Sequence, residues 1–141
     1  MIKFELVTLR GVKLSEEVHE VLLPTLDGQI AVFENHAPLV SIAKTGVISV
    51  RRKSDHPDDM LDHYAVTGGV IEIADNVVRV LVDEADHSAD VSEKEAQEAL
   101  ENAKKLYSEA KDQMSIDKAQ SMIDRQAVRL RVAELRRRTR R

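Results

Sequence analysis

The chain has 141 residues, enough for one ordinary domain or for a smaller domain with an appendage. Its hydrophobic fraction of 43% supplies a core, and since only 3% of the residues are aromatic, that core must be built from Val, Ile, Leu and Ala. The chain has no cysteine, which excludes a disulfide framework, a thiolate metal site and a cysteine nucleophile together.

The net charge of −4 is divided unevenly along the chain. Residues 1–90 contain 8 basic and 16 acidic residues, whereas residues 91–141 contain 13 basic and 9 acidic ones. All five glycines and all three prolines lie at or before Gly69, so short elements joined by turns should give way to longer ones. This division predicts a protein of two parts, residues 1–87 and 88–141.

The amino terminus predicts neither a signal peptide nor a membrane span. Charged residues interrupt every apolar pair among the first six residues. No stretch approaches the roughly 20 apolar residues that a spanning helix needs. We therefore expect a soluble protein, or one bound to a membrane only through another protein.

The first part of the chain has the pattern of short strands. Alternating or β-branched apolar runs occur at residues 3–7, 18–23, 46–51, 64–67, 70–73 and 77–82. Turn signals such as Gly11, Asp27-Gly28 and Asp75-Asn76 separate them, and the polar stretch 52–62 predicts an exposed loop. Several short strands indicate a sandwich or a barrel. Because some strands are apolar on both faces, we expect one sheet packed against another.

From Ser92 the apolar period becomes helical. The sequence Ser92-Glu93-Lys94-Glu95 is a capping box, in which a hydroxyl and a carboxylate satisfy free amides at a helix start. The apolar stripe that follows is mostly alanine and contains Ala96, Ala99, Leu100, Ala103, Leu106, Tyr107 and Ala110. Small side chains bury little area each, so this face should stabilise the structure weakly.

A second helix is expected to begin at Ser115 as its cap, with Asp117 favourable for the helix dipole. Its apolar stripe contains Ile116, Ala119, Ile123, Ala127 and Leu130. Residues 112–115, which join the two helices, include neither glycine nor proline. The pair can therefore fold as a hairpin or straighten into one long rod.

The sequence contains no recognisable catalytic motif. It lacks a HExxH pair, a Walker A loop and a GxSxG elbow, and its carboxylates do not converge on acid–base chemistry. His56 and His63 lie near several aspartates of the stretch 52–62 and could hold a metal weakly. A solvated polar loop is favoured, because metal sites need ordered ligands. We therefore predict a protein that is not an enzyme and holds no cofactor.

The arginine-rich end of the chain has three interpretations. Eight arginines fall within the last 17 residues, at positions 125, 129, 131, 136, 137, 138, 140 and 141. They could pair with an acidic protein surface, neutralise nucleic-acid phosphates, or simply favour the carboxyl end of a solvated helix. The acidic first 90 residues and the scarcity of aromatic residues argue against nucleic acid.

Three stretches in a fixed order carry a family resemblance. Residues 27–40 contain a Gly-rich turn followed by His-Ala-Pro-Leu; residues 68–85 and 130–135 supply the second and third matches. Together they resemble the epsilon subunit of bacterial and chloroplast ATP synthases, called delta in mitochondria. The chain departs from the family pattern at Ala31, at Glu34-Asn35 and in a longer 52–62 loop. Asn35 is a mild exchange, because Asn tolerates left-handed backbone.

This resemblance implies an antiparallel β-sandwich of about ten strands followed by a two-helix hairpin. It implies a non-catalytic rotor subunit in the central stalk of a proton- or ion-translocating F-type ATP synthase. Such a subunit couples rotation of the c-ring to the catalytic head through gamma. It is a peripheral protein on the cytoplasmic face of the cell inner membrane, where it meets the membrane only through its partners and binds no nucleic acid.

The resemblance also assigns residues to partners. Those on the side of the c-ring and gamma are Asp27, Gly28, Gln29, Glu34, His36, Pro38 and Leu39. The helical part resembles an arm that folds on the sandwich or extends along gamma toward the alpha and beta subunits, where it inhibits ATP hydrolysis. For the acidic surface of the beta subunit we expect Arg125, Arg129, Arg131, Arg136 and Arg137.

Some relatives bind ATP at this hairpin through an Ile/Leu-Asp-x-x-Arg-Ala motif. The aligned stretch here is 91–96, in which Ser92 replaces the Asp and Glu95 replaces the Arg. A second Arg of the family corresponds to Asn102. Because Glu95 reverses the charge that would face phosphate, we predict no tight nucleotide binding.

Overall fold

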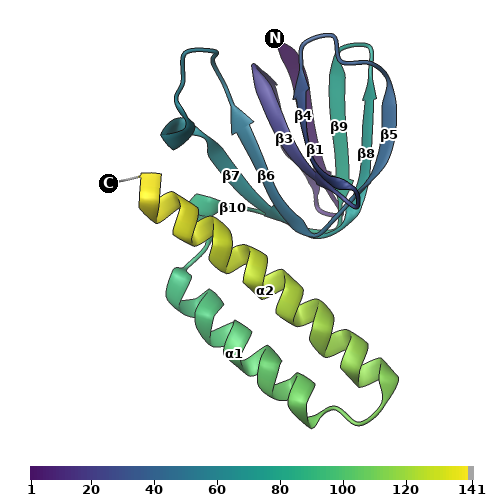
Figure 1. Cartoon of the computed structure of the whole chain (residues 1–141), viewed down its shortest axis with the longest axis vertical. Coiled ribbons are helices and arrows are strands. Elements are labelled where there is room, and N and C mark those ends of the chain that lie inside the picture. The colour runs from purple at the N-terminus through teal and green to yellow at the C-terminus, as the bar shows by residue number, and fades with distance from the viewer. Residues whose placement is uncertain (140–141) are drawn as a thin grey trace.

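A computed structural model of the chain describes residues 1–139, which form a β-sandwich followed by two long helices (Figure 1). The strands are β1 (Ile2–Thr8), β2 (Gly11–Val18), β3 (Glu20–Thr25), β4 (Gly28–Phe33), β5 (Leu39–Ala43), β6 (Gly46–Arg51), β7 (Asp62–Val66), β8 (Gly69–Ala74), β9 (Val77–Val82) and β10 (Ala85–His87). The helices are α1 (Glu93–Glu109) and α2 (Gln113–Thr139), with short 3-10 turns η1 (Asp58–Met60) and η2 (Ser88–Asp90). The expected fold class is confirmed.

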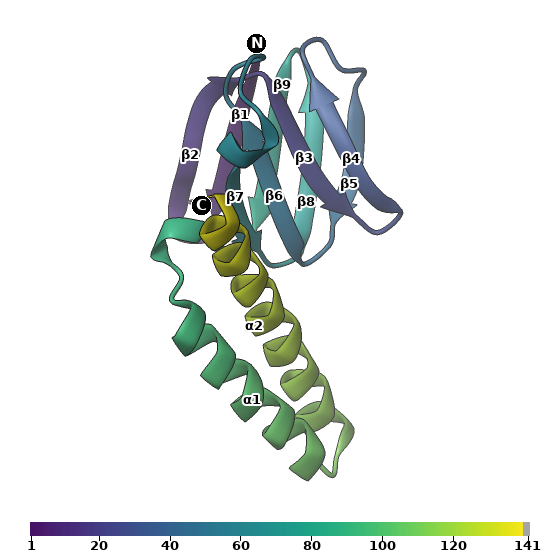
Figure 2. The same ribbon diagram turned by 60° about the vertical axis from the view of Figure 1, so that its left-hand side comes forward.

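The strands form one continuous sheet that folds over on itself (Figures 1 and 2). Its order is β10-β7-β6-β3-β5-β8-β9-β1-β2, with β4 on the free edge of β3. The pairing is antiparallel except between β1 and β9, which run parallel. The enclosed core is aliphatic around two aromatic side chains, Phe4 of β1 and Tyr64 of β7, and every strand except β10 supplies at least one side chain that is no more than 5% exposed.

Some strands are apolar on both faces, but their outer faces are not covered in the way that the sequence predicted. Their inner faces meet in the core, but their outer faces do not lie against a second sheet. The outer residues Val47 of β6 and Ala65 of β7 pack in a small cluster with Val132 of α2. The outer residues of β5, β8 and β9 remain exposed. One apolar outer face is therefore covered by a helix, and the other is open.

The polar loop after β6 is shorter and better ordered than the sequence predicts. Strand β7 already begins at Asp62, so the loop ends at Leu61. Arg51 ties the loop down, because its guanidinium donates to the His56 carbonyl and to Asp58 Oδ1, the latter at 2.6 Å. The third contact of Arg51 is with Glu20 of β3, at 2.9 Å.

The two helices begin with different caps. Ser92 Oγ accepts a hydrogen bond from the Glu95 amide at 3.3 Å, which confirms the hydroxyl half of the predicted capping box. The prediction that Ser115 caps the second helix is wrong. Helix α2 begins two residues earlier, and Asp112 Oδ1 accepts from the Ser115 amide at 2.7 Å. That bond lowers the pKa of Asp112, because an ionised carboxylate is the stronger acceptor at a helix start.

The helices lie side by side as a folded hairpin, the state that the sequence left open (Figures 1 and 2). Ala96, Leu100 and Ala103 of α1 are buried, as is Ala119 of α2, so this part of the predicted stripes forms the contact. The prediction is wrong for Leu106 and Tyr107 of the first stripe and for Ala127 of the second, which are exposed. For Ala127 the reason is that α2 has two faces to bury, one toward α1 and one toward β7. Neither helix, over the residues described, is long and apolar enough to cross a bilayer.

Candidate partner-binding surfaces

The residues predicted to face the c-ring and gamma lie at two opposite ends of the sandwich. Asp27, Gly28 and Gln29 are exposed at the turn between β3 and β4. Residues 34–38 follow the far end of β4 and lead into β5. The six residues of β4 separate the two groups by roughly 16 Å. The residues of each group therefore lie together, but the two groups do not form one surface.

The β3–β4 turn is built by local hydrogen bonds. Thr25 Oγ1 donates to the Gly28 carbonyl and accepts from the Asp27 amide at 3.2 Å. Gly28 has φ +118°, a conformation that favours glycine. These bonds use backbone groups and the threonine side chain, which leaves the Asp27 and Gln29 side chains exposed to solvent.

Residues 34–38 are held against the amino terminus and the β8–β9 turn. The Met1 amino group lies 2.8 Å from Glu34 Oε1, and this hydrogen bond lowers the pKa of Glu34. The Asn35 amide donates to Asn76 Oδ1 at 2.8 Å, and Asn35 has φ +59°, the left-handed conformation that Asn tolerates. His36 Nδ1 lies 2.7 Å from the Ala37 carbonyl. Of the remaining predicted residues, Pro38 and Leu39 are exposed.

An exposed apolar row crosses the outer face of the sheet, and sequence reasoning did not identify it as a surface. Ile42 of β5 pairs with Val70 of β8, which pairs with Leu81 of β9. Their side chains are 57%, 43% and 43% exposed, and Val40 on the same face of β5 is 74% exposed. We call these four residues the apolar row. Apolarity on both faces of these strands was its signal in the sequence.

The arginines of α2 do not form one free basic surface in this hairpin. Arg125 Nη2 lies 2.7 Å from Glu84 Oε2, and Arg129 forms an ion pair with Asp86, so both are bound to the sandwich. Arg131 faces Glu134 of its own helix at 4.0 Å, and Arg137 lies 3.2 Å from Glu93 at the start of α1. Arg136 also has an interaction partner. Arg140 and Arg141 lie outside the described residues.

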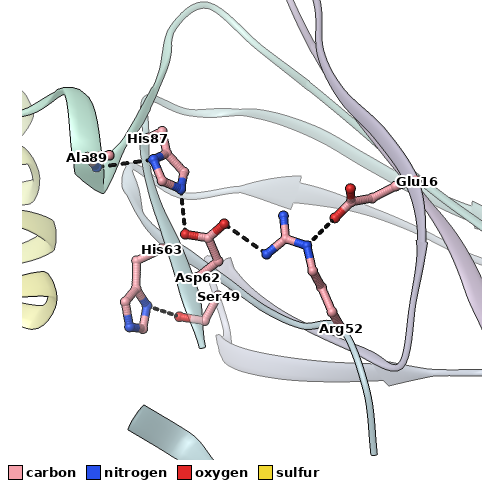
Figure 3. A network of polar contacts seen from close by, with 7 residues as sticks. All are labelled: Glu16, Ser49, Arg52, Asp62, His63, His87 and Ala89. Atoms are coloured by element: carbon pink, nitrogen blue, oxygen red, sulfur yellow. Dashed lines mark hydrogen bonds and ion pairs between the residues drawn. The ribbon is translucent and has the colours of Figure 1, made fainter. Parts of the chain in front are cut away.

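A polar network holds the junction between sandwich and hairpin (Figure 3). Asp62 of β7 bonds to His87 of β10 through one oxygen and to Arg52 Nη1 at 2.9 Å through the other. Arg52 Nε lies 2.7 Å from Glu16 of β2. His87 Nδ1 accepts from the Ala89 amide at 3.1 Å and so caps η2, the turn that leads to α1.

The histidine pair weighed as a weak metal site is separated by the fold. His63 is not in the loop but in β7, where it is 6% exposed and its Nδ1 lies 2.8 Å from Ser49 Oγ. His56 stays in the loop, half-buried. Within residues 1–139 we find no group of three or more His, Asp or Glu side chains arranged to hold a metal ion.

The ion pair between Arg129 and Asp86 gives a first prediction. Arg129→Ala should weaken docking of α2 on the sandwich by about 1 kcal/mol, since both side chains are only partly exposed. A double-mutant cycle with Asp86→Ala, followed by urea unfolding at low and high salt, measures the pair. The control is Arg138→Ala, an exposed arginine of the last described turn. Equal effects of Arg129→Ala with and without Asp86 would contradict the pairing.

Comparison with known proteins identifies a family and relatives that this chain resembles. The family described as ATP synthase, Delta/Epsilon chain, beta-sandwich domain matches residues 1–88. The ATP synthase epsilon chain of Herpetosiphon aurantiacus is 31% identical over 137 residues, which cover 96% of each chain. The chloroplastic ATP synthase epsilon chain of Oltmannsiellopsis viridis is 38% identical over 100 residues, covering 71% of this chain and 72% of its own.

Solved structures share the fold at lower identity. A chain in the cryo-EM structure of the Euglena gracilis mitochondrial ATP synthase superposes with a TM-score of 0.79 at 21% identity, covering 94% of this chain and 81% of its own. A chain in the central stalk and c-ring of the Tetrahymena thermophila mitochondrial ATP synthase has a TM-score of 0.58 at 15% identity, covering 95% of each. The sandwich, the hairpin and the sequence matches together show that the chain belongs to the epsilon-chain family of ATP synthases.

Proposed function

We propose that the chain is a non-catalytic rotor subunit of an F-type ATP synthase. In this role it couples rotation of the c-ring to the catalytic head through the gamma subunit. It works on the cytoplasmic face of the membrane, which it meets through its partners. The family membership supports assembly into this complex, and the exposed apolar row supports a permanent protein partner within it.

The apolar row is the observation that carries this proposal. Residues 42, 70 and 81 lie side by side across three paired strands, with Val40 beside them. A contiguous apolar surface of this kind marks a site of protein association. A charged row runs beside it, from Glu72 of β8 through Arg79 of β9 to Glu5 of β1. We assign the apolar row to gamma, with the charged row as the polar rim of that interface.

The two ends of the sandwich have different roles in this arrangement. We assign Asp27, Gly28 and Gln29 to the c-ring, because these residues are exposed and the apolar row lies toward the same end of the sheet. Glu34 and His36, at the other end, are engaged in contacts within the chain. They, with Pro38 and Leu39, would then border the gamma interface rather than the ring.

Residues 88–141 would act as a regulatory arm. The alanine-rich contact between α1 and α2 buries small side chains, so a modest difference in affinity for a partner can open it. Arg125 and Arg129 are bound by Glu84 and Asp86 in the docked state. An acidic surface of the beta subunit would have to replace these carboxylates. The arm would thus exchange an internal acidic partner for an external one.

Reconstitution with alpha, beta and gamma subunits tests the proposal. Binding to gamma and ATP hydrolysis are measured with the full-length chain and with a truncation ending at Ala89, which keeps the entire sandwich core. We expect both to bind and only the full-length chain to suppress hydrolysis. Suppression by neither would remove the inhibitory arm, and binding by neither would remove the rotor assignment.

A pair of exposed apolar residues tests the apolar row itself. Val70→Lys should weaken binding to gamma at least about tenfold, because it would bury an unpaired charge at the interface. Met60→Lys also replaces an apolar side chain by lysine, but in η1 between β6 and β7, away from the row, at a position that is 53% exposed. We expect Met60→Lys to bind like the wild type. Equal affinities of the two variants would show that gamma docks elsewhere.

A further inference from the structure

One titratable side chain is buried between the sandwich and the arm. In β7, Tyr64 and Val66 point into the sandwich core, whereas Ala65 on the other face packs in the cluster with Val132 of α2. His63 shares the outer face with Ala65, since side chains alternate along a strand. It is nonetheless only 6% exposed, and α2 packs on this face of β7. Its burial therefore depends on the docked arm.

The surroundings of His63 suit a neutral ring better than a charged one. Burial is the largest influence and lowers the pKa of His63. Among the nearby charges, Asp62 on the same strand has the largest influence and raises this pKa, while Arg131 on α2 and the neighbouring His87 lower it. Asp62 also bonds to Arg52 and His87, and Asp58 of η1 is paired with Arg51.

The hydrogen bond between His63 and Ser49 does not favour either charge state strongly. Ser49 Oγ, on the adjacent strand β6, lies 2.8 Å from His63 Nδ1 (Figure 3). A hydroxyl can donate to a neutral ring nitrogen or accept from a protonated one, so this contact survives protonation. The environment supplied by α2 therefore decides the difference between the two charge states.

We propose that His63 makes docking of the arm sensitive to pH, because a neutral imidazole fits beneath α2 and an imidazolium does not. Acidification releases α2 from β7, and neutral or alkaline pH returns it. The site is a proton-binding switch formed by β7, β6 and α2. No other partner is needed for it to operate in the isolated chain.

The direction of the pH effect on docking follows from the lowered pKa of His63 in the docked state. Above the ordinary histidine pKa of about 6.5, both states are neutral and docking is at full strength. As the pH falls below that value, the undocked chain binds a proton that the docked chain does not. The ratio of undocked to docked chains then rises by up to about tenfold per pH unit. The rise stops at the lowered pKa of the docked state.

The absence of cysteine makes a direct assay possible, since one introduced thiol is then unique. Ala65→Cys places a thiol beneath α2, where the side chain is 4% exposed. Its rate of reaction with dithiodipyridine is divided at each pH by the rate for Lys13→Cys, an exposed site on β2. This ratio reports the undocked fraction. Between pH 7.5 and 5.5 we expect it to rise several-fold, in a window that carboxylates do not enter.

His63→Asn and His19→Asn, each made in the Ala65→Cys background, assign the effect. Asparagine keeps a polar atom near the position of Nδ1 for Ser49 but does not titrate, so the ratio should become flat. His19→Asn removes a histidine between β2 and β3 and should leave the rise unchanged. A rise that persists in His63→Asn would overturn the proposal. A ratio that is flat in the unsubstituted His63 protein would also overturn it.

An NMR titration of the full-length chain gives a second measurement. The His63 ring should titrate below about 6.5, whereas an ordinary value would overturn the proposal even if the asparagine variant folded poorly. The docking assay does not depend on the proposed function. Only the consequence does: if the arm inhibits ATP hydrolysis, acidification should strengthen inhibition by the full-length chain and leave the His63→Asn complex unchanged.

Discussion

Replacement of Phe4 by alanine is expected to lower the free energy of unfolding by about 3–5 kcal/mol. Phe4 of β1 is fully buried, and it is the largest of the fully buried side chains in the sandwich core. An aliphatic core with so few aromatic residues has nothing of similar volume to fill the cavity. Urea unfolding followed by circular dichroism measures the loss.

Phe33→Ala is the matched control for this prediction. Phe33 ends β4 and is 45% exposed, and its ring contacts His19 edge-on with centroids 5.7 Å apart. Its loss should cost less than about 1.5 kcal/mol. Similar losses for the two phenylalanines would mean that the core is not centred on Phe4.

Gly69→Ala is expected to destabilise the sandwich by about 3 kcal/mol or more. Gly69 begins β8 and pairs with Val82 of β9, and a Cβ at this position would lie 1.9 Å from the Leu81 carbonyl oxygen. Backbone cannot move aside as a flexible side chain can, so the β8–β9 pairing must open. Urea unfolding measures the loss, and binding to gamma should weaken because Val70 and Leu81 flank the clash.

Gly11→Ala separates this clash from a general intolerance of side chains at glycine. Gly11 has φ +118°, but no heavy atom beyond Gly11 and its two chain neighbours lies within 4 Å of the position that a Cβ would take, so alanine there meets only backbone strain. We expect a loss of about 1–2 kcal/mol. A loss at Gly69 no larger than that at Gly11 would contradict the predicted collision.

The arm is held on the sandwich by two kinds of weak contact rather than by one strong contact. The arm is docked by a small aliphatic cluster around Val132 and by the ion pairs of Arg125 and Arg129 with the sandwich. Ion pairs that are exposed or partly exposed, as these are, are screened by salt. Salt and acid should therefore both favour release, and the His63→Asn variant should retain the salt response while losing the acid response.

The sequence predicted what depends on local pattern. The change of apolar period at Ser92, the turns at Gly28 and at residues 74–76, and the confinement of glycine and proline to the first half indicated strands followed by helices. The ordered matches around His36 and Gly68 indicated the family. Each of these signals lies within a short stretch of chain, where periodicity and turn chemistry act directly.

Four strands were not identified separately, because their own signals are weak. Strands β2 and β10 lie at the edges of the sheet; β2 carries three charged residues, and β10 is only three residues long. Strands β4 and β5 were taken with the family motif rather than as strands. The start of α2 was misplaced because Asp112 and Ser115 are both good caps. Only the observed hydrogen bond shows which of them is used.

The sequence by itself determined the two-part architecture, the family and the absence of thiol chemistry, since these follow from composition and from the order of short motifs. The tertiary structure decided which apolar faces are covered and which are open. It separated Asp27 from His36 by the length of a strand, paired Arg129 with Asp86, and placed His63 beneath α2. These are contacts between residues distant in the chain, and the period of a strand gives the face of a side chain but not what lies against that face.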